Sequence, residues 1–304
     1  MNNDTNRKDR PVKGRLSRIK RKERRQVNMF LLPSLVGMLI FYILPFFVII
    51  YYSLVNNPVK AEFVFLDNFI SLLKNSAFRQ AALNTLRFSF SAVPLAVVLS
   101  LLLAIALMRN IPLRSRLRTV FLSPMMVPIA SIILIWQVVF HYNGTANELL
   151  SLFGVAPIDW LKSDFSQLVV ILLFLWKNLG YNMILFMSAL AAIPEDVLEV
   201  AQLEGATALQ VFFKIKLRYL SSTALFVTLM SIINSFKVFR EVFLLTGKYP
   251  YDSLYMLQHF MNNVFDKLEY QKLSAAAIIM ALVIGVIIGL MFLFDNKLEE
   301  DIQE

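Results

Sequence analysis

The chain contains no cysteine, and only two histidines, His141 and His259, occur among its 304 residues. Without thiols it has no disulfide framework, no thiolate nucleophile and no cysteine-bound metal. Neither histidine lies near a second ligand at helical or loop spacing, so we expect no metal site. The patterns GxxxxGKS/T and GxGxxG, which bind nucleotide phosphates, do not occur either. The sequence therefore predicts no catalytic residues and no cofactor held by this chain.

Charged residues are scarce, and apolar residues exceed what a water-soluble domain needs. Hydrophobic residues make up 58% of the chain and charged residues 17%, whereas a soluble domain is closer to about half apolar. Six segments are long enough to cross a hydrocarbon core of ~30 Å, and the alternation typical of a membrane β-barrel is absent. We expect an all-α polytopic membrane protein with six transmembrane helices, at residues 29–53, 86–108, 117–142, 168–192, 222–246 and 275–294.

The basic residues predict how these spans are oriented. Nineteen lysines and arginines lie in one set of segments, at residues 1–28, 109–118, 193–222 and after 294, and seven lie in the opposite loops, 54–85, 143–167 and 247–274. The positive-inside rule then places both termini and the 193–222 loop in the cytoplasm. We expect three parts: a basic cytoplasmic tail (1–28), a six-span domain (29–294) and an acidic cytoplasmic tail (295–304).

The basic tail invites comparison with nucleic-acid-binding arms, but it directly precedes a span. A polybasic segment in that position binds anionic lipid headgroups, so membrane lipid is an expected partner and nucleic acid is not. The tail and first span do not form a cleaved signal peptide, because the span is too long, contains Pro33 and Pro45, and is not followed by a small-residue cleavage site.

The segment "AIPEDVLEVAQLEGA", residues 192–206, is a polar interruption between two spans. Pro194 suits the first position of a helix, and acidic residues follow in the first turn, where the helix dipole favours them. Gly205 suits a position with positive φ after the helix, and Thr207 with Gln210 forms a capping box for a second helix. Physical reasoning leaves two interpretations open: an interfacial helix pair lying on the bilayer, or a knob that docks into another protein.

A resemblance favours docking. The letters "EVAQLEGA", preceded by "IP" and followed by "FFKIKL", resemble the EAA motif in the membrane subunits of ABC importers. The motif falls here on Glu199, Ala201, Glu204, Gly205 and Ala206. Val200 replaces an alanine, Glu204 an aspartate and Arg218 a proline. Residues 65–89, 118–150 and 234–247 also resemble the carbohydrate subclass, of the maltose-permease and glycerol-phosphate-permease type, and the likeness covers roughly residues 30 to 295.

This resemblance implies the fold of a type I ABC importer permease and a location in the bacterial cell membrane. It implies that the 193–222 loop carries the coupling helix, which seats in a cleft of a separate ATPase subunit where ATP is bound. The implied partners are a second permease subunit, two ATPase subunits and an extracytoplasmic solute-binding protein. The implied function is to form the translocation path of an ATP-driven carbohydrate importer. A self-contained channel or secondary carrier, the alternative of a different class, needs no coupling helix, and the inverted repeat of many carriers is absent.

Polar residues inside the predicted spans mark a candidate path. Charges at this depth are costly and usually face an interior cavity. Span four carries Lys177, Asn178, Tyr181 and Asn182, and span five carries Asn234, Lys237, Arg240 and Glu241. One interpretation is structural: Arg240 pairs with Glu241 or with another span. The other is a water-filled path in which amides and charges bind sugar hydroxyls while Trp176, Tyr181 or Phe236 stacks on the ring.

Two further features bear on how such a path works. Pro94, Pro124 and Pro128 lie within spans two and three, where they favour bends. Where the family commonly has "TGGGP" after span five, this chain has "TGKYP", which adds Lys248. With the three cations in the spans, Lys248 makes four against Glu241 as the one acid in these segments. Either another span supplies carboxylates, or the cargo is an acidic saccharide or a solute like glycerol phosphate.

Overall fold

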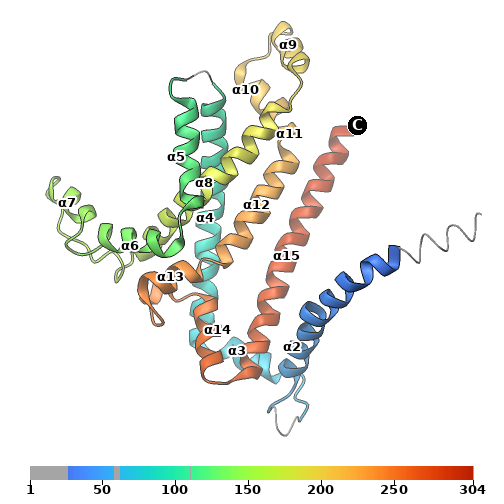
Figure 1. Ribbon diagram of the computed structural model, residues 1–304, viewed down its shortest axis with the longest axis vertical. Helices are drawn as coiled ribbons and strands as arrows, with labels where there is room; N and C mark the ends of the chain where they lie inside the picture. Colours follow the sequence, from blue (N-terminus) through green and yellow to red (C-terminus); the bar gives the residue numbers. More distant parts are fainter. Residues whose placement is uncertain (1–26, 58–61, 110, 304) are drawn as a thin grey trace, which may run out of the picture.

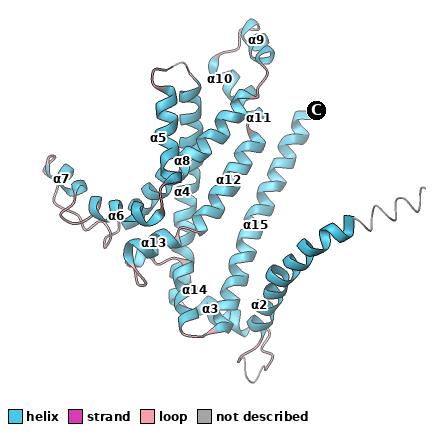
Figure 2. Cartoon of the chain, in the orientation of Figure 1, coloured by secondary structure: helices cyan, strands magenta, loops and turns pink. Residues whose placement is uncertain are grey.

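The computed structural model describes residues 27–57, 62–109 and 111–303 of the chain (Figure 1). Within these residues the backbone is helical, with connecting loops and no strand beyond a single bridge between Val55 and Phe63 (Figure 2). The basic tail, for which a contact with lipid headgroups was predicted, lies outside the described residues, apart from its last two positions. The acidic tail at 295–303 continues the last helix.

Five helices in the described residues are long and apolar enough to cross a membrane, and each matches a predicted span. They are Val27–Leu54, which includes η1 (Leu39–Ile43) and α2 (Leu44–Leu54); α4 (Ser76–Met108); α8 (Ser166–Ala191); Ser221–Thr246, which includes α12 (Ser221–Phe236) and α13 (Phe239–Thr246); and α15 (Tyr270–Gln303). The second begins ten residues earlier than predicted. The side chain of Asn75 caps it by accepting a hydrogen bond from the N–H of Phe78 at 3.1 Å.

The predicted third span, 117–142, is sharply bent, and a bend in this span was expected from its prolines. It consists of α5 (Arg114–Met126) and α6 (Ile129–Val139), which meet at an angle of 103°. The bend lies at Pro128, which lacks an N–H to continue the helix and holds Val127 in an extended conformation (φ −87°, ψ 133°). Counted as one segment, the bent pair makes the sixth span. By contrast, α4 passes through Pro94 without a break.

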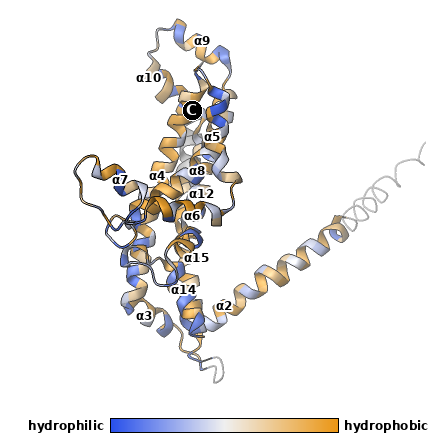
Figure 3. Cartoon of the chain, turned by 60° about the vertical axis from the view of Figure 1, so that its left-hand side comes forward, coloured by the Kyte–Doolittle hydropathy of each residue, from blue (hydrophilic) through white to orange (hydrophobic). Residues whose placement is uncertain are grey.

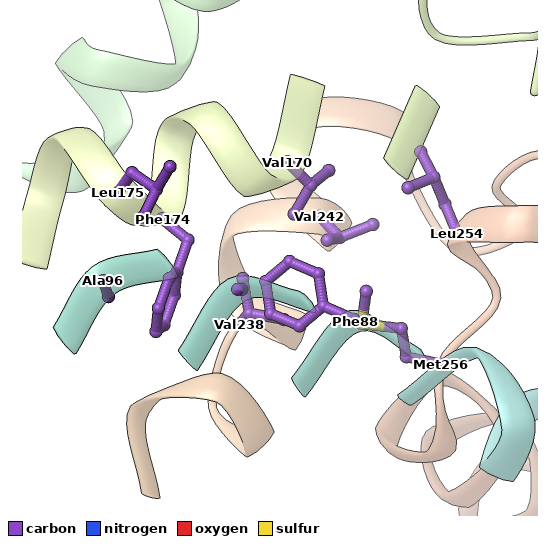
Figure 4. Close-up of a cluster of buried hydrophobic side chains, with 10 residues drawn as sticks. Phe88, Ala96, Val170, Phe174, Leu175, Val238, Val242, Leu254 and Met256 are labelled. Carbon is purple, nitrogen blue, oxygen red and sulfur yellow. The ribbon is translucent and has the colours of Figure 1, made fainter. Parts of the chain in front are cut away.

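A core of apolar side chains joins α4, α8 and α13 (Figure 4). Phe88 of α4 and Phe174 of α8 meet edge to face with their ring centroids 5.6 Å apart. Ala92 and Ala96, both fully buried, let the two helices approach closely. Inside a membrane such contacts stabilise the fold mainly through close packing, because lipid is as apolar as the side chains. This core fixes α8 and α13 relative to each other.

The crossing of α5 over α8 depends on Gly180. A Cβ atom at this position would overlap the carbonyl group of Phe121 and come within 3.1 Å of the backbone nitrogen of Leu122. The two backbones are therefore in direct contact, which only glycine permits. The contact brings the bend between α5 and α6 beside the middle of α8.

Short helices cover one end of the bundle, opposite the end that carries α9 (Glu195–Leu203) and α10 (Ala208–Gln210) (Figure 1). The covering elements are α3 (Asp67–Lys74), η3 (Asp252–Leu254) and α14 (Leu257–Asp266). The side chain of Asn84 donates to the carbonyls of Asp252 and Tyr255, at 2.6 and 3.0 Å, and the Thr85 hydroxyl accepts from the N–H of Leu257 at 2.9 Å. These hydrogen bonds tie the cap to α4.

The first span is held differently from the others. Along Val27–Leu54 its most apolar stretch has no buried residue, and Ser53 is the one buried residue in α2. Its contacts lie at one end, where Tyr52 meets Tyr270 of α15 at 6.3 Å between ring centroids and Asn68 donates to the carbonyls of Ser53 and Val55. The rest of the helix diverges from α15 (Figure 1).

We predict that Gly180→Ala destabilises the protein by roughly 1–3 kcal/mol, the usual cost of an overpacked contact, because the added methyl group forces α5 and α8 apart. Gly285→Ala is the matched control, since nothing lies within 4 Å of a Cβ atom there. The measurement is the thermal unfolding midpoint of the purified protein in detergent. Equal midpoints for both variants would show that the crossing tolerates a side chain.

His259 in the cap is predicted to make stability depend on pH. Its ring is 1% exposed and packs edge-on against Phe239 at 4.6 Å between centroids. Burial lowers its pKa from 6.5 to about 4. As the pH falls from 6.5 toward about 4, the unfolded chain binds a proton that the folded chain does not, so this contribution to stability is lost.

The measurement for His259 is the unfolding midpoint of the wild type and of His259→Gln, each at pH ~7.5 and pH ~5, a range within which the ring titrates in the unfolded state alone. We expect acidification to lower the midpoint of the wild type more than that of the variant, because glutamine does not titrate. Identical losses in the two proteins would contradict the assignment.

Candidate functional site

The predicted path residues of span four lie in two rows on α8. Lys177 and Tyr181 are one turn apart, as are Asn178 and Asn182, so each pair shares a face of the helix. Lys177 and Tyr181 are partly exposed, whereas Asn178 is 8% and Asn182 2% exposed. The two rows also differ in their contacts: Lys177 forms an ion pair, whereas Asn178 and Asn182 form hydrogen bonds with α12.

The other predicted path residues lie in the fifth span, at or near a break in its helix. The helix stops at Phe236, turns at Lys237 and Val238, and resumes at Phe239. The N–H of Lys237 bonds the carbonyl of Asn234 at 3.1 Å, three residues back, so the turn is tighter than an α-helix. Val238 is anchored in the apolar core. The break redirects the chain so that Arg240 and Glu241 face α8.

Glu241 forms an ion pair with Lys177 of α8. The Nζ atom of Lys177 lies 2.5 Å from Oε1 of Glu241, and the Glu241 side chain is 6% exposed. Arg240 approaches the same oxygen at 3.9 Å and remains 65% exposed. The structural interpretation paired Arg240 with Glu241 or with another span; the contact between Arg240 and Glu241 is present, but Lys177 is the nearer partner of Glu241. Oε2 of Glu241 is buried without a hydrogen-bond partner in the described part of the chain.

Hydrogen-bonded amides join the same two spans. Nδ2 of Asn234 donates to Oδ1 of Asn178 at 2.9 Å, while Nδ2 of Asn178 donates to the carbonyl of Phe174 at 2.8 Å. Nδ2 of Asn182 donates to the hydroxyl of Ser231 at 3.1 Å. Asn182 is buried, and its hydrogen bond ties α8 to α12.

Two adjoining cavities, of about 440 and 380 Å³, bring seven of the eight predicted path residues together. Both are lined by Lys177, Asn178, Asn234 and Arg240. The larger adds Lys237, Val238, Glu241, Gln258, Leu173 and Phe174; the smaller adds Tyr181, Pro124, Met125, Val127, Ile129 and Ile132. Their size and mixed lining are those of small-molecule sites. No group of three potential metal ligands occurs in the described residues.

Sequence reasoning missed some of this lining and misplaced two aromatic residues. Gln258 comes from α14, outside the spans, and no sequence pattern identified it as a lining residue. Pro124 was expected to favour a bend but was not predicted to line a cavity. Trp176 packs on Trp136 at 5.4 Å between ring centroids and does not line either cavity. Phe236 is 9% exposed and joins an apolar cluster with Val93 and Ile232. Of the three proposed stacking residues, Tyr181 faces the cavities.

The fourth predicted cation, Lys248, is paired with a residue of the cap. Its Nζ lies 2.5 Å from Oδ2 of Asp266, at the end of α14, and 5.9 Å from the ring centroid of Tyr249. The hydrogen bond to Asp266 raises the pKa of Lys248 above its ordinary value. The expectation that Glu241 is the one acid for four cations is therefore corrected, because Asp266 neutralises one of them.

The 193–222 loop forms the turn that its sequence predicted. Pro194 is the residue before α9 rather than its first residue. The helix ends at Leu203, Gly205 has φ +80°, and the N–H of Ala206 reaches back to the carbonyl of Ala201 at 2.9 Å. This is the glycine-terminated helix end expected from the motif.

The capping box of the second helix is present. The N–H of Thr207 donates to Oε1 of Gln210 at 2.7 Å, and the N–H of Gln210 donates to the Thr207 hydroxyl at 3.4 Å. The chain then runs through α10, η2 (Val211–Lys216) and α11 (Leu217–Tyr219) into α12.

The motif residues divide between the surface and the interior of this loop. Glu199, Glu204 and Gly205 are exposed and Ala206 is half-buried, but Ala201 is 8% exposed. Ala201 therefore packs within the loop. Exposed Val200 and Leu203 lie among the acids, so polar and apolar residues alternate over α9 and α10 (Figure 3). This mixed, protruding surface has no partner within the described chain.

Known proteins share this architecture. The chain is 29% identical over 269 residues to the trehalose/maltose transport system permease protein MalF of Thermococcus litoralis, with 86% of this chain and 91% of the relative covered. It is 27% identical to the probable starch degradation products transport system permease protein AmyD of Thermoanaerobacterium thermosulfurigenes, with 89% and 94% covered. A subunit of a bacterial ABC transporter for the import of alginate superposes with a TM-score of 0.79 at 21% identity, over 92% of this chain and 99% of that one.

The likeness to the solved structure establishes the type I importer permease fold. The chain also matches a sequence family. The match covers residues 96–300 and thus runs from the middle of α4 nearly to the end of α15. The chain therefore belongs to the family of binding-protein-dependent transport system inner membrane components.

Proposed function

We propose that this permease subunit imports a carbohydrate through the cavities between α8 and the break in span five. The observation that carries the proposal is a polar cavity, lined by two hydrogen-bonded asparagines and an ion pair, within the membrane-spanning domain. Relatives that align over most of the chain are named for trehalose and maltose and for starch degradation products. Both kinds of cargo are polyhydroxylated.

The lining suits sugar hydroxyls, which both donate and accept hydrogen bonds. Asn178, Asn234 and Gln258 offer amide groups that can donate to and accept from hydroxyls, and the Glu241 carboxylate lines the same cavity. Tyr181 provides an aromatic face for the apolar side of a sugar ring. Asn182 supports this arrangement from behind, because it ties α12 to α8.

The exposed part of the 193–222 loop is the proposed joint with an ATPase subunit. Glu199 and Glu204 give it charge, Gly205 and Ala206 allow close approach, and Ala201 shapes the turn from inside. A rigid, capped turn suits transmission of a movement from one subunit to another. The working importer would contain a second permease, two ATPase subunits that bind ATP, and a solute-binding protein. A similarly folded importer has been solved in complex with its alginate-bound periplasmic protein.

The proposed orientation places the loop and both termini in the cytoplasm. In the structure the connection between α4 and α5, the 193–222 loop and the end of α15 lie toward one end, while α3 and α14 lie at the other (Figure 1). Residues 109–118 carry four lysines and arginines and the 193–222 loop carries three, and the positive-inside rule, which counts these residues, favours the same side for both. A self-contained carrier, the alternative considered from the sequence, has no ATPase subunit to bind the exposed surface of the 193–222 loop.

The orientation predicts the result of fusing a reporter at two positions. A reporter after Phe153, beyond α7 (Thr145–Ser151), should be extracytoplasmic, and one after Gly205 should be cytoplasmic. Enzymes that are active on one side of the membrane, such as alkaline phosphatase and β-galactosidase, provide the readout. The reverse pattern would contradict the orientation.

Coupling predicts loss of transport in two variants of the loop. Glu199→Lys reverses an exposed charge, and Gly205→Pro imposes a negative φ where the native value is +80°. Both should abolish stimulation of the ATPase by loaded binding protein in the reconstituted importer, while the chain still inserts in the membrane.

Two controls make this test specific. Glu148→Lys makes the same charge change on exposed α7, away from the loop, and Gly205→Asn keeps a residue that tolerates positive φ. Both should retain most of the stimulation. Near wild-type stimulation in Glu199→Lys and Gly205→Pro would exclude the loop as the joint.

A further inference from the structure

Two cations remain in the path after every ion pair in the described residues has been assigned. Lys177 is neutralised by Glu241, and Lys248 by Asp266. Lys237 is exposed and has no hydrogen-bond or ion-pair partner within the described residues. Arg240 reaches only the oxygen of Glu241 that Lys177 already holds, at 3.9 Å against 2.5 Å. Glu241 thus contacts two cations, Lys177 and Arg240, and the side chain of Lys237 has no counter-charge within the described residues.

These two cations lie in the proposed path. Both line the larger cavity, and Arg240 lines the smaller cavity as well. They are three residues apart across the break in span five, and Val238 between them is 3% exposed within the core. The break therefore turns both cationic heads away from the core. With 65% of its side chain exposed, Arg240 has N–H groups free to bind a further acceptor.

A surplus of positive charge in a membrane domain is costly unless an anion enters with it. Charges attract far more strongly in such surroundings than in water, and cations at this depth usually have a counter-charge. Arg240 presents a planar fork that fits a carboxylate in a bidentate manner. Beside it, the hydrogen-bonded Asn178–Asn234 pair offers amide groups for hydroxyls. Carboxylate and hydroxyls on one molecule are the chemistry of a uronic acid.

We propose that the substrate of this path is an anionic saccharide whose carboxylates contact Arg240 and Lys237. The inference rests on the proposed carbohydrate transport and narrows its substrate class. Lys177 does not take part as a free cation, because its charge holds Glu241 in place. A sugar phosphate shares the negative charge but has a different geometry, so the experiment includes it as a separate arm.

The absence of cysteine from the chain allows a direct test of the charge in the cavity. Met125→Cys places a thiol in the wall that Arg240 also lines. In the assembled importer we would measure the labelling rates of this thiol with methanethiosulfonates of negative and positive charge, with the otherwise identical protein lacking the thiol as background. We expect the negative reagent to react faster, and the ratio of rates to fall about tenfold when Lys237→Gln and Arg240→Gln are combined.

Lys248→Gln is the matched control, because it removes an equal charge that is already paired with Asp266; the ratio should not change. A ratio near one in the parent protein, unaffected by the double substitution, would overturn the proposal. It would mean that carboxylates from the second permease already neutralise Lys237 and Arg240.

The same thiol reports on the ligand without relying on the selectivity of a binding protein. We expect trigalacturonate to protect it from labelling at least about tenfold more effectively than α-1,4-galactotriose, the neutral counterpart, and this preference to disappear in the double variant, since each charged hydrogen bond contributes about that much. Equal protection, or none, would overturn the anionic class, and stronger protection by glycerol 3-phosphate would replace the saccharide with a phosphate. The ATPase test of coupling does not depend on these results, so failure here is distinguishable from failure of the proposed function.

Discussion

A carboxylate buried in a membrane domain needs a cation close by, and the geometry of the cavities follows from how this chain supplies one. Glu241 lies 64 residues from Lys177 in sequence and 2.5 Å from it in space. For the two to meet, span five must bend toward α8, and the break at Lys237 and Val238 provides that bend. The turn also carries Arg240 to the cavity wall. Removing either member of the ion pair would leave the other charge buried and uncompensated, which is strongly destabilising. The pair therefore holds α8 and the broken part of span five together at the cavity.

The opposite wall depends on backbone geometry more than on charge. Gly180 lets α5 touch α8, and Pro128 directs α6 away from α5 at 103°. Together they place an irregular, apolar bend against the polar face of α8. Non-helical backbone at membrane depth is tolerated where it lines a cavity, and the cavity beside Pro124 and Val127 meets that condition. The cap that contains α14 is held to α4 by hydrogen bonds of Asn84 and Thr85 and not by apolar packing alone.

The features that could be predicted from the sequence are those that composition and local backbone geometry determine. Hydropathy located five spans and the polar residues within them, and local rules predicted the positive φ of Gly205 and the capping box at Thr207. The sequence did not predict the direction of the third segment, because transfer into lipid depends on composition and not on whether a helix is straight. Nor did it choose Lys177 as the partner of Glu241, identify Gln258 as lining, or bury Ala201. Those contacts join residues that the folded backbone brings together, and no local pattern encodes them.

The first span contacts the rest of the chain at one end, near Tyr52 and Tyr270, and α15, the helix that it meets there, is made much later. Between the end of the first span at Leu54 and the start of α15 at Tyr270 the ribosome adds about 215 residues, which at typical synthesis rates takes roughly 10 to 40 s. During that interval the first span stands in the bilayer as an independent helix, anchored by its own length and apolarity. Its surface, exposed along nearly all of its length, is suited to lipid from the moment of insertion. The order of synthesis thus requires this helix to be stable in the membrane by itself.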